Sequence, residues 1–384
     1  MKRLNDTEKK QLGVLINYYR NAFFRSNTAN YEDYKQINFC RDICSQSQLS
    51  RLENGEVLRE QDIYYIFLNK LNLSFEKVPA KDYSYFTAYV ENIWQIQNND
   101  NLTLNYNEYI LVINKYQNIF KKNILYTHYN YVLEFILLIL DEDLEEATYL
   151  LEDIENTTEI LYPKLLILCL QHLGKYYHRT GDFGKSNKYY LLAIEHMYKN
   201  KIDNPIIYVD TALNNIKMGK YVYALDYLHK AHSHFTGSDN YRILGDIYSY
   251  YGLLYLYRKY FDDAINAFFV SLGYGKKINK PLFLQKQYLF LSAGFYVTED
   301  YRKSEMYLAE AEKVLYEQIK RATQHKSVWE FYRSKDDNIF QINLKNIPGL
   351  LPEYIRIIFI YDLYEHYKKN KKYKKALEIT ERYF

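Results

Sequence analysis

One short segment of the chain carries side chains that could read the edges of DNA bases. It runs from Cys44 to Gly55 with the sequence CSQSQLSRLENG. Gln can pair with adenine, Ser can bond to either base, and Arg can pair with guanine or neutralise a phosphate. Leu49 and Leu52 lie three residues apart, so they share one buried face of a helix and leave the polar side chains outside. The segment therefore has the composition of a recognition helix.

The polar side chains of this segment have different expected roles. Gln46, Gln48 and Arg51 should reach base edges from the opening turns of the helix. Ser45 and Ser47 can cap or open the helix, and Ser47 also lies on its outer face. Asn54 should meet or support the DNA backbone, and Gly55 supplies the left-handed residue that ends the helix.

Apolar residues at helical spacing surround the recognition segment on both sides. Residues 11–24 predict a first helix, and residues 34–43 predict a second, shorter helix with Ile37 and Phe39. Residues 63–71 continue as a fourth helix, after which Leu73 and Phe75 close the bundle. The order of these helices predicts a small helical domain that holds the recognition segment at its surface.

This helix order, together with the phrase SQLSRLENG, resembles the bacterial XRE-type helix-turn-helix domain over residues 8–78. The resemblance implies a phosphate contact for Gln36, at the start of the second helix. Two features depart from the family. The polar connection of residues 25–33 is long, and Lys35 stands where a capping Ser or Thr is common.

The charge of this region gives DNA little general attraction. Residues 1–77 hold twelve Lys and Arg against ten Asp and Glu, a difference of +2. We therefore expect a homodimer that reads a pseudo-palindromic double-stranded operator with half-sites about one or two helical turns apart. A degenerate helix-turn-helix that does not bind DNA is the alternative.

Composition indicates a folded, reduced protein of more than one domain. The 384 residues include 46 Tyr and 20 Phe but only 6 Pro and 13 Gly, which leaves ample core and few linkers. Three Cys cannot form a disulfide framework, and Cys40 and Cys44 should be small buried hydrophobes. No signal peptide follows the N-terminus, and the apolar run at 131–140 is too short to span a bilayer. We expect a soluble cytoplasmic protein that does not bind membranes.

The chain beyond residue 80 repeats itself. A turn, an aromatic or apolar residue and then a small residue recur, and the small residues lie 39, 38, 40 and 40 positions apart. They are Ala147, Ser186, Ala224, Ala264 and Ser304, and Ala376 follows a longer gap. A repeat of this length holds two helices, whose close packing requires a small residue where they meet.

The repeat resembles the tetratricopeptide pattern, with Gly174 and Gly252 on first helices and small residues on second helices. We expect an all-α fold in which residues 1–78 form the helix-turn-helix domain. Residues 79–384 should form a right-handed superhelix of repeats for ligand binding and dimerisation, with an irregular repeat or insertion at 321–348.

A helix-turn-helix followed by such repeats resembles the peptide-pheromone-responsive regulators of Gram-positive bacteria, the PlcR, NprR and Rgg group. The resemblance implies a quorum-sensing transcription regulator whose repeats bind a short signalling oligopeptide. Such a peptide needs partners for its backbone N–H and C=O groups, and Asn and Gln amides serve both. The candidates on first helices are Gln171, Lys175, His178, Asn214, Asn215, Tyr250, Gln287 and Tyr296. Lys175 could bind the terminal carboxylate of the peptide.

Catalysis finds no support in the sequence. It contains no Gly-rich phosphate loop, no nucleophile elbow and no C-x-x-C or H-E-x-x-H spacing, so we expect no enzyme, no cofactor and no metal. The acidic run at 142–146 should face water; so should the lysines of 368–375, with DNA contact as the alternative. Two other functions stay open: a repeat protein that binds another protein and carries a degenerate helix-turn-helix, and a modulator of a phosphorelay.

Overall fold

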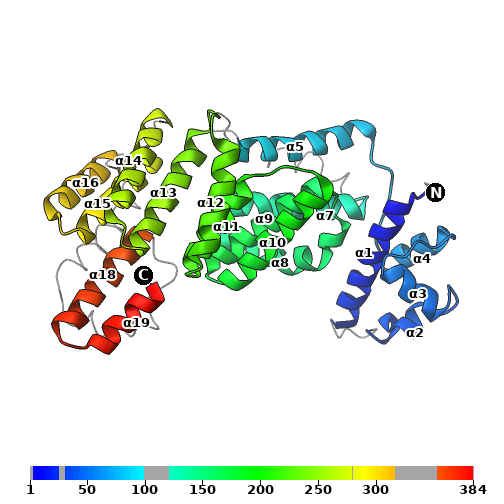
Figure 1. Cartoon of the computed structure of the whole chain (residues 1–384). Coiled ribbons are helices and arrows are strands. Elements are labelled where there is room, and N and C mark those ends of the chain that lie inside the picture. The colour runs from blue at the N-terminus through cyan, green and yellow to red at the C-terminus, as the bar shows by residue number, and fades with distance from the viewer. Residues whose placement is uncertain (1–2, 26–30, 99–120, 279, 316–352, 384) are drawn as a thin grey trace. The chain divides into compact units, whose positions relative to one another are not determined.

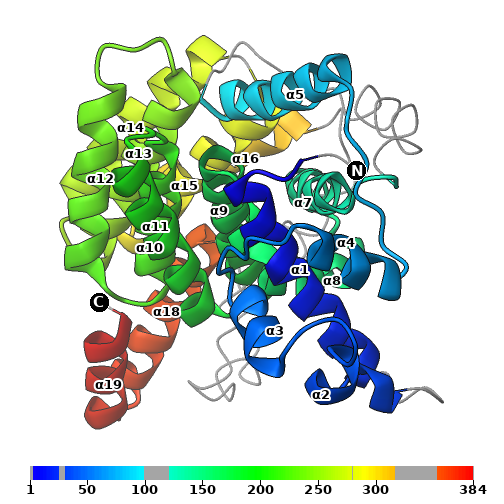
Figure 2. The same cartoon turned by 90° about the vertical axis from the view of Figure 1, so that its right-hand side faces the viewer.

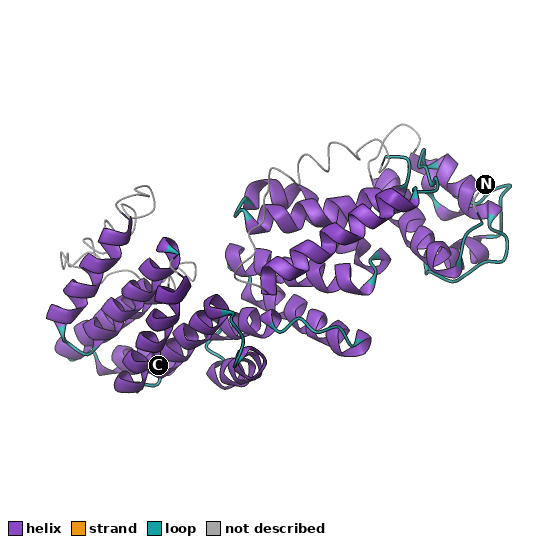
Figure 3. Ribbon diagram, turned by 90° about the horizontal axis from the view of Figure 1, so that it is seen from above, coloured by secondary structure: helices purple, strands orange, loops and turns teal. Residues whose placement is uncertain are grey.

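The computed structural model is built of helices and describes residues 3–25, 31–98, 121–278, 280–315 and 353–383 (Figures 1 and 3). Within these ranges the only strand-like pairing is one isolated bridge between Phe75 and Asn123. The all-α fold expected from the sequence is confirmed. None of the described helices is both long and apolar enough to cross a bilayer.

The first helices are α1 (Asp6–Arg25), the 3-10 helix η1 (Tyr31–Tyr34), α2 (Gln36–Phe39), α3 (Gln46–Glu53), α4 (Asp62–Lys70) and α5 (Ala80–Asn98). The next are α7 (Ile124–Leu140), α8 (Leu144–Thr157), the 3-10 helix η2 (Thr158–Ile160), α9 (Pro163–Thr180), α10 (Phe183–Asn200), α11 (Ile206–Lys217) and α12 (Tyr221–Phe235). The last are α13 (Tyr241–Tyr257), α14 (Phe261–Ile278), α15 (Pro281–Val297), α16 (Tyr301–Leu315), α18 (Glu353–Lys369) and α19 (Tyr373–Tyr383).

The chain divides into two compact units. Unit 1 comprises Met1–Ile96, Leu102–Tyr176 and Leu192–Ile202, and unit 2 comprises Gln97–Asn101, Tyr177–Leu191 and Asp203–Phe384. The helices α1–α4 thus share a unit with α7, α8 and the beginning of α9. The boundary expected after residue 78 does not coincide with a boundary between these compact units. As a division between two functions it stays a prediction.

The helix-turn-helix core of unit 1 depends on a close approach between α1 and α3. Leu12, Ile16, Leu49 and Leu52 are fully buried between the helices. A Cβ added to Gly13 would lie only 2.1 Å from the carbonyl oxygen of Leu52, so glycine is required there. The buried positions of Leu49 and Leu52, and the left-handed Gly55 at φ 75°, confirm the expected helix and its C-terminal turn.

The segment before α3 differs from the expected second helix. The chain forms the short 3-10 helix η1 and then the four-residue α2, instead of one helix over residues 34–43. Phe39 is buried and stacks on Phe67 at 4.9 Å, but Ile37 is 61% exposed. Four helical residues make little more than one turn, so only one apolar side chain can face the core. Residues 26–30 of the long connection lie outside the described residues.

The helix-turn-helix bundle is tied to the first repeat by backbone pairing. The backbone N–H of Ile124 donates to the carbonyl of Ser74 at 2.9 Å. The backbone N–H of Glu76 donates to the carbonyl of Lys122 at 2.8 Å. Asn123, the N-cap of α7, also donates its Nδ2 to the carbonyl of Glu76. The start of the repeats and the end of the bundle are therefore held together within unit 1.

The repeats are pairs of packed helices joined by tight turns. The pairs α7–α8, α11–α12, α13–α14, α15–α16 and α18–α19 pack along their lengths (Figures 1 and 2). The small residue near the start of each second helix is buried, which confirms the predicted repeat. The insertion expected at 321–348 lies outside the described residues.

A backbone feature of the turns is as regular as the small residues. A residue with positive φ stands five positions before each small residue; these residues are Glu142, Gly181, Gly219, Lys259, Glu299 and Lys371, with φ between 53° and 87°. Only two of the six are glycine, so sequence inspection does not show the pattern. The left-handed residue reverses the chain within a few residues and brings each second helix back along the first.

Candidate DNA-reading and ligand-binding surfaces

The helix α3, which carries most of the predicted DNA contacts, begins with a complete capping box. Ser45 Oγ accepts the backbone N–H of Gln48 at 3.2 Å, and Gln48 Oε1 accepts the backbone N–H of Ser45 at 3.0 Å. Ser45 and Gln48, both predicted to contact DNA, are therefore hydrogen-bonded to the backbone at the start of the helix. There they satisfy N–H groups that have no carbonyl partner within the helix. A contact between Gln48 and a DNA base stays a prediction. To make this contact, the Gln48 side chain would have to give up its hydrogen bond to the backbone of Ser45, which is one half of the capping box.

Three of the predicted DNA-binding side chains stand free of the core. Gln46, Ser47 and Arg51 are exposed on α3 while Leu49 and Leu52 are buried. Arg51 Nε forms an exposed ion pair with Glu56 Oε2 at 2.6 Å. Asn54 is exposed at the C-cap of α3. The arrangement leaves one face of α3 polar and open, as a helix that enters a DNA groove requires.

Gln36 belongs to a buried polar network that sequence reasoning missed. Its Nε2 donates to Glu53 Oε2 at 2.7 Å, and Gln46 Nε2 lies 3.4 Å from its Oε1. Glu53 forms a buried ion pair with Arg20, whose NH1 also donates to the carbonyl of Tyr34 at 2.9 Å. This network connects α1, α2 and α3, so it fixes the orientation of α3. Its signal in the sequence is Arg20, a charge that follows the apolar Leu12 and Ile16 at helical spacing on α1.

The helix α1 also docks on the first repeat through side-chain hydrogen bonds. Gln11 Nε2 donates to Tyr129 Oη at 2.8 Å, and Tyr18 donates its hydroxyl to Asp153. Tyr19 Oη lies 3.0 Å from His128 Nε2, and burial of this histidine lowers its pKa to about 4. His128 is therefore neutral at pH 7, and its unprotonated ring nitrogen can accept a hydrogen bond from the hydroxyl of Tyr19.

The amides predicted to hold a peptide are mostly inside the array. Gln171, in unit 1, and Asn214, Asn215 and Gln287, in unit 2, are each 3% exposed or less. Lys175 in unit 1 and His178 and Tyr296 in unit 2 are partly exposed. Ligand contact by any of these residues stays a prediction, and the buried amides could take part only if the array opened.

In unit 2 the buried amides bond to protein groups. Asn214 Nδ2 donates to the carbonyl of Phe183 at 3.0 Å, and its Oδ1 lies 3.0 Å from His178 Nδ1. Asn215 Nδ2 donates to the carbonyl of Thr211 at 2.8 Å. Asn214 thus connects α11 to the end of α9 and the start of α10 and acts as part of the scaffold.

Gln287 forms the centre of a second buried cluster. Its Oε1 lies 2.7 Å from Ser249 Oγ and 2.6 Å from Ser271 Oγ. Both hydroxyls also lie within 2.9 Å of the carbonyl oxygen of Gly245. The cluster connects α13, α14 and α15 through small side chains.

A charged pair that the sequence analysis did not single out lies beside Tyr250. Lys286 Nζ on α15 bonds to Asp246 Oδ1 on α13 at 2.8 Å, and its ammonium lies 5.3 Å from the centre of the Tyr250 ring. Burial by itself lowers the pKa of Lys286. The charge of Asp246 and the contact with Tyr250 together raise it by more than burial lowers it, so the pKa of Lys286 is above its usual range. The pair is partly exposed, and it joins two first helices of successive repeats.

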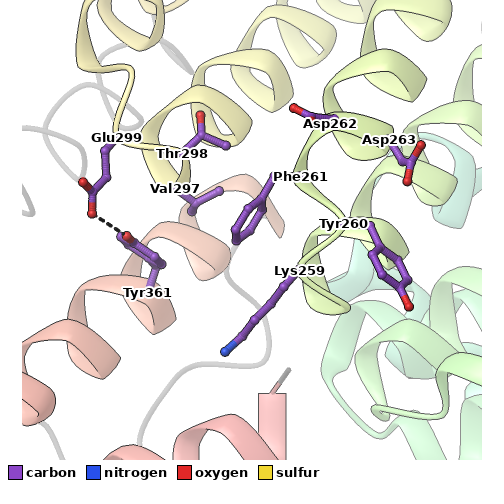
Figure 4. A pocket seen from close by; sticks show the side chains of 9 residues that line it. All are labelled: Lys259, Tyr260, Phe261, Asp262, Asp263, Val297, Thr298, Glu299 and Tyr361. Carbon is purple, nitrogen blue, oxygen red and sulfur yellow. Dashed lines mark hydrogen bonds between the residues drawn. The ribbon is translucent and has the colours of Figure 1, made fainter.

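One pocket of about 590 Å³ lies at the inter-helix turns of unit 2 (Figure 4). It is lined by Lys259, Tyr260, Phe261, Asp262, Asp263, Val297, Thr298, Glu299 and Tyr361. On one side of the pocket, the hydroxyl of Tyr361 donates a hydrogen bond to Glu299 Oε1 at 3.0 Å (Figure 4). Among the described residues no group of three or more His, Cys, Asp or Glu side chains could hold a metal ion.

Comparison with known proteins finds only distant structural likenesses. No family model and no curated sequence matches the chain. BtubC from P. vanneervenii aligns with a TM-score of 0.39 and 21% identity over 46% of this chain and 75% of its own. A STAND-type signal transduction ATPase with a tetratricopeptide repeat sensor from Pyrococcus horikoshii aligns with a TM-score of 0.45 and 19% identity over 80% of this chain, which spans only 45% of that protein.

PlcR from Bacillus thuringiensis, in complex with the peptide PapR7 and DNA, aligns with a TM-score of 0.39 and 15% identity. The alignment covers 83% of this chain and 98% of PlcR. At 15% identity no individual residue of PlcR is matched to a residue of this chain. The bound peptide and DNA are properties of the PlcR structure alone.

Proposed function

We propose that this chain is a cytoplasmic DNA-binding transcription regulator that acts as a homodimer and whose repeats bind a short signalling peptide. The observation that carries the DNA part is the geometry of α3. Leu49 and Leu52 anchor the helix, the Arg20–Glu53 ion pair fixes its orientation, and Gln46, Ser47 and Arg51 remain exposed. A helix that is held this firmly while its outer face stays polar is suited to the major groove.

Selection of bound sequences from a random duplex library tests the DNA part. We expect the wild-type chain to enrich a pseudo-palindrome, and a triple Ala variant of Gln46, Ser47 and Arg51 to lose that preference. Gln48 is left unchanged because its replacement would remove the capping box and weaken α3 itself. The matched control replaces Lys81, Asn92 and Gln95, exposed residues of α5, by Ala. Enrichment of one sequence by both triple variants would refute the assignment.

The peptide part rests on the Asp246–Lys286 pair and the Tyr250 ring. These side chains present a negative group and a positive group on neighbouring first helices, with the buried Tyr250 ring beside them. An extended peptide offers N–H and C=O groups to such a pair. Tyr296, whose hydroxyl donates to Asp362 Oδ1 at 3.0 Å, presents a partly exposed ring for an apolar side chain further along unit 2.

Calorimetry with candidate peptides measures this site. We expect Asp246→Asn to weaken peptide binding about tenfold, because loss of a charged hydrogen bond costs on the order of 1.5–3 kcal/mol. Asp226→Asn is the control, since Asp226 forms an exposed ion pair with Lys230 at 2.8 Å on α12. Equal affinities in both variants would remove the Asp246–Lys286 pair from the peptide site.

A further inference from the structure

The turn between α18 and α19 holds the densest positive charge of the chain. Residues 368–375 contain six lysines and no acid, and no other eight-residue window has as many basic residues. We call this set the lysine turn; it consists of Lys368, Lys369, Lys371, Lys372, Lys374 and Lys375. All six side chains are exposed.

Few acidic groups neutralise the lysine turn. Lys368 Nζ lies 3.4 Å from Glu365 Oε1, in an exposed pair. Lys369, Lys372 and Lys374 form no ion pair with any carboxylate of the described residues. Like charges crowded on one turn repel one another, and this repulsion is relieved when an anionic partner binds.

Aromatic rings support two of these ammonium groups. Lys375 Nζ lies 5.5 Å from the centre of the Tyr367 ring, and Lys368 Nζ lies 5.7 Å from that of Tyr364. Lys259, from the α13–α14 turn, places its Nζ 5.0 Å from the same Tyr364 ring. The rings hold the lysine stems and leave the charges at the surface, which reduces the side-chain entropy lost on binding.

We propose that the lysine turn binds the phosphate backbone of duplex DNA without regard to sequence. The inference deepens the proposed DNA-binding function and rests on it. The helix-turn-helix region carries a charge difference of only +2, so it supplies little of the counterion release that drives DNA binding. The lysine turn supplies six positive charges, and DNA carries one negative charge per about 1.7 Å of its axis.

A membrane is a poorer partner for this surface. Anchoring in a bilayer needs a broad apolar face next to the basic residues. Among the described side chains of α19, only Tyr373 and Leu377 are large, apolar and exposed. Duplex DNA requires positive charge alone, which the lysine turn provides.

The test compares two triple variants of the full chain. One replaces Lys369, Lys372 and Lys374 by Gln, and its matched control replaces Lys276, Lys277 and Lys280, which are exposed at the end of α14 and before α15. Both lose three charges from unit 2 and keep the left-handed Lys371 unchanged. Affinity for a random-sequence duplex of about 30 base pairs is measured between about 50 and 200 mM salt, and thermal midpoints confirm that both variants fold.

We expect the first variant to bind the duplex at least tenfold more weakly at low salt. The slope of log K against log salt should become shallower by about 0.9 for each phosphate that the variant no longer neutralises. The control should keep the wild-type slope. Equal slopes in the two variants would overturn the inference, and so would binding of the wild type to phosphatidylserine vesicles with no binding to the duplex.

The same measurements separate this inference from the proposed function. If the wild type enriches no sequence from the random library, the proposed sequence-specific reading fails. If it enriches a sequence and the lysine variant keeps the wild-type salt slope, only the role of the lysine turn fails.

Discussion

The helix-turn-helix bundle and the repeat array use polar residues in opposite ways. In the bundle the polar side chains expected to read DNA are exposed on α3, and one buried ion pair beneath them fixes the helix. In the array the amides expected to hold a ligand are buried and bond to neighbouring helices. A short helix on a small bundle has one free face, whereas a first helix of a repeat is covered on nearly all sides. The same polar residue types therefore indicate a binding surface in the bundle and a structural contact in the array.

The largest effect should come from the buried ion pair between Arg20 on α1 and Glu53 on α3. Glu53→Ala leaves the Arg20 guanidinium buried without its carboxylate, which costs about 3–5 kcal/mol of stability. The exposed pair of Lys230 and Asp226 is the comparison, and Asp226→Ala should change stability by less than about 1 kcal/mol. Urea unfolding followed by circular dichroism measures both. A small, equal shift in the two variants would show that Arg20 finds solvent or another partner.

Acid should next weaken the junction between α1 and the first repeat. Burial lowers the pKa of His128 to about 4 from its ordinary value near 6.5. Between these values the unfolded chain binds the proton and the folded chain does not, so stability falls as the pH is lowered from about 6.5 to 4. The full loss is about 3 kcal/mol.

A His128→Gln variant separates this residue from the other titrating groups. Gln can bond to Tyr19 and Thr157, the neighbours of the two ring nitrogens, but it does not titrate. Thermal midpoints measured from pH 7 to pH 4 should fall less steeply in the variant than in the wild type. Parallel curves would mean that His128 contributes nothing to the acid sensitivity.

The buried Asn214 should show an effect of intermediate size. Asn214→Ala removes the partner of His178 and of the Phe183 carbonyl, and buried groups left without a partner cost about 1–3 kcal/mol. Asn266, exposed on α14, is the matched control, and Asn266→Ala should be neutral or slightly stabilising because Ala favours helix. Thermal midpoints measure the two, and an Asn214 variant as stable as the control would show that the hydrogen bonds of Asn214 contribute no net stability.

Sequence alone predicted the features that depend on local periodicity. The buried Leu49 and Leu52, the left-handed Gly55 and the small residues of the second helices all follow from spacing along one helix or one turn. What it missed depends on residues far apart in the chain. Glu53 pairs with Arg20 across 33 positions and Asp246 with Lys286 across 40, and neither distance corresponds to a helical period. The burial of Asn214 likewise depends on packing between repeats.

The smallest effect concerns the turns that shape the array. Glu142 adopts φ 66° in the α7–α8 turn, a conformation that costs a residue with a Cβ on the order of 1 kcal/mol and costs glycine little. Both Glu142→Gly and Glu142→Ala remove the carboxylate, so their difference isolates the backbone term. We expect the Gly variant to be more stable than the Ala variant by about 1 kcal/mol. At Gly273, inside α14 with open space where a Cβ would go, the order should reverse, because Ala is the better helix former. The same order at both positions in urea unfolding would show that the turn does not require its left-handed residue.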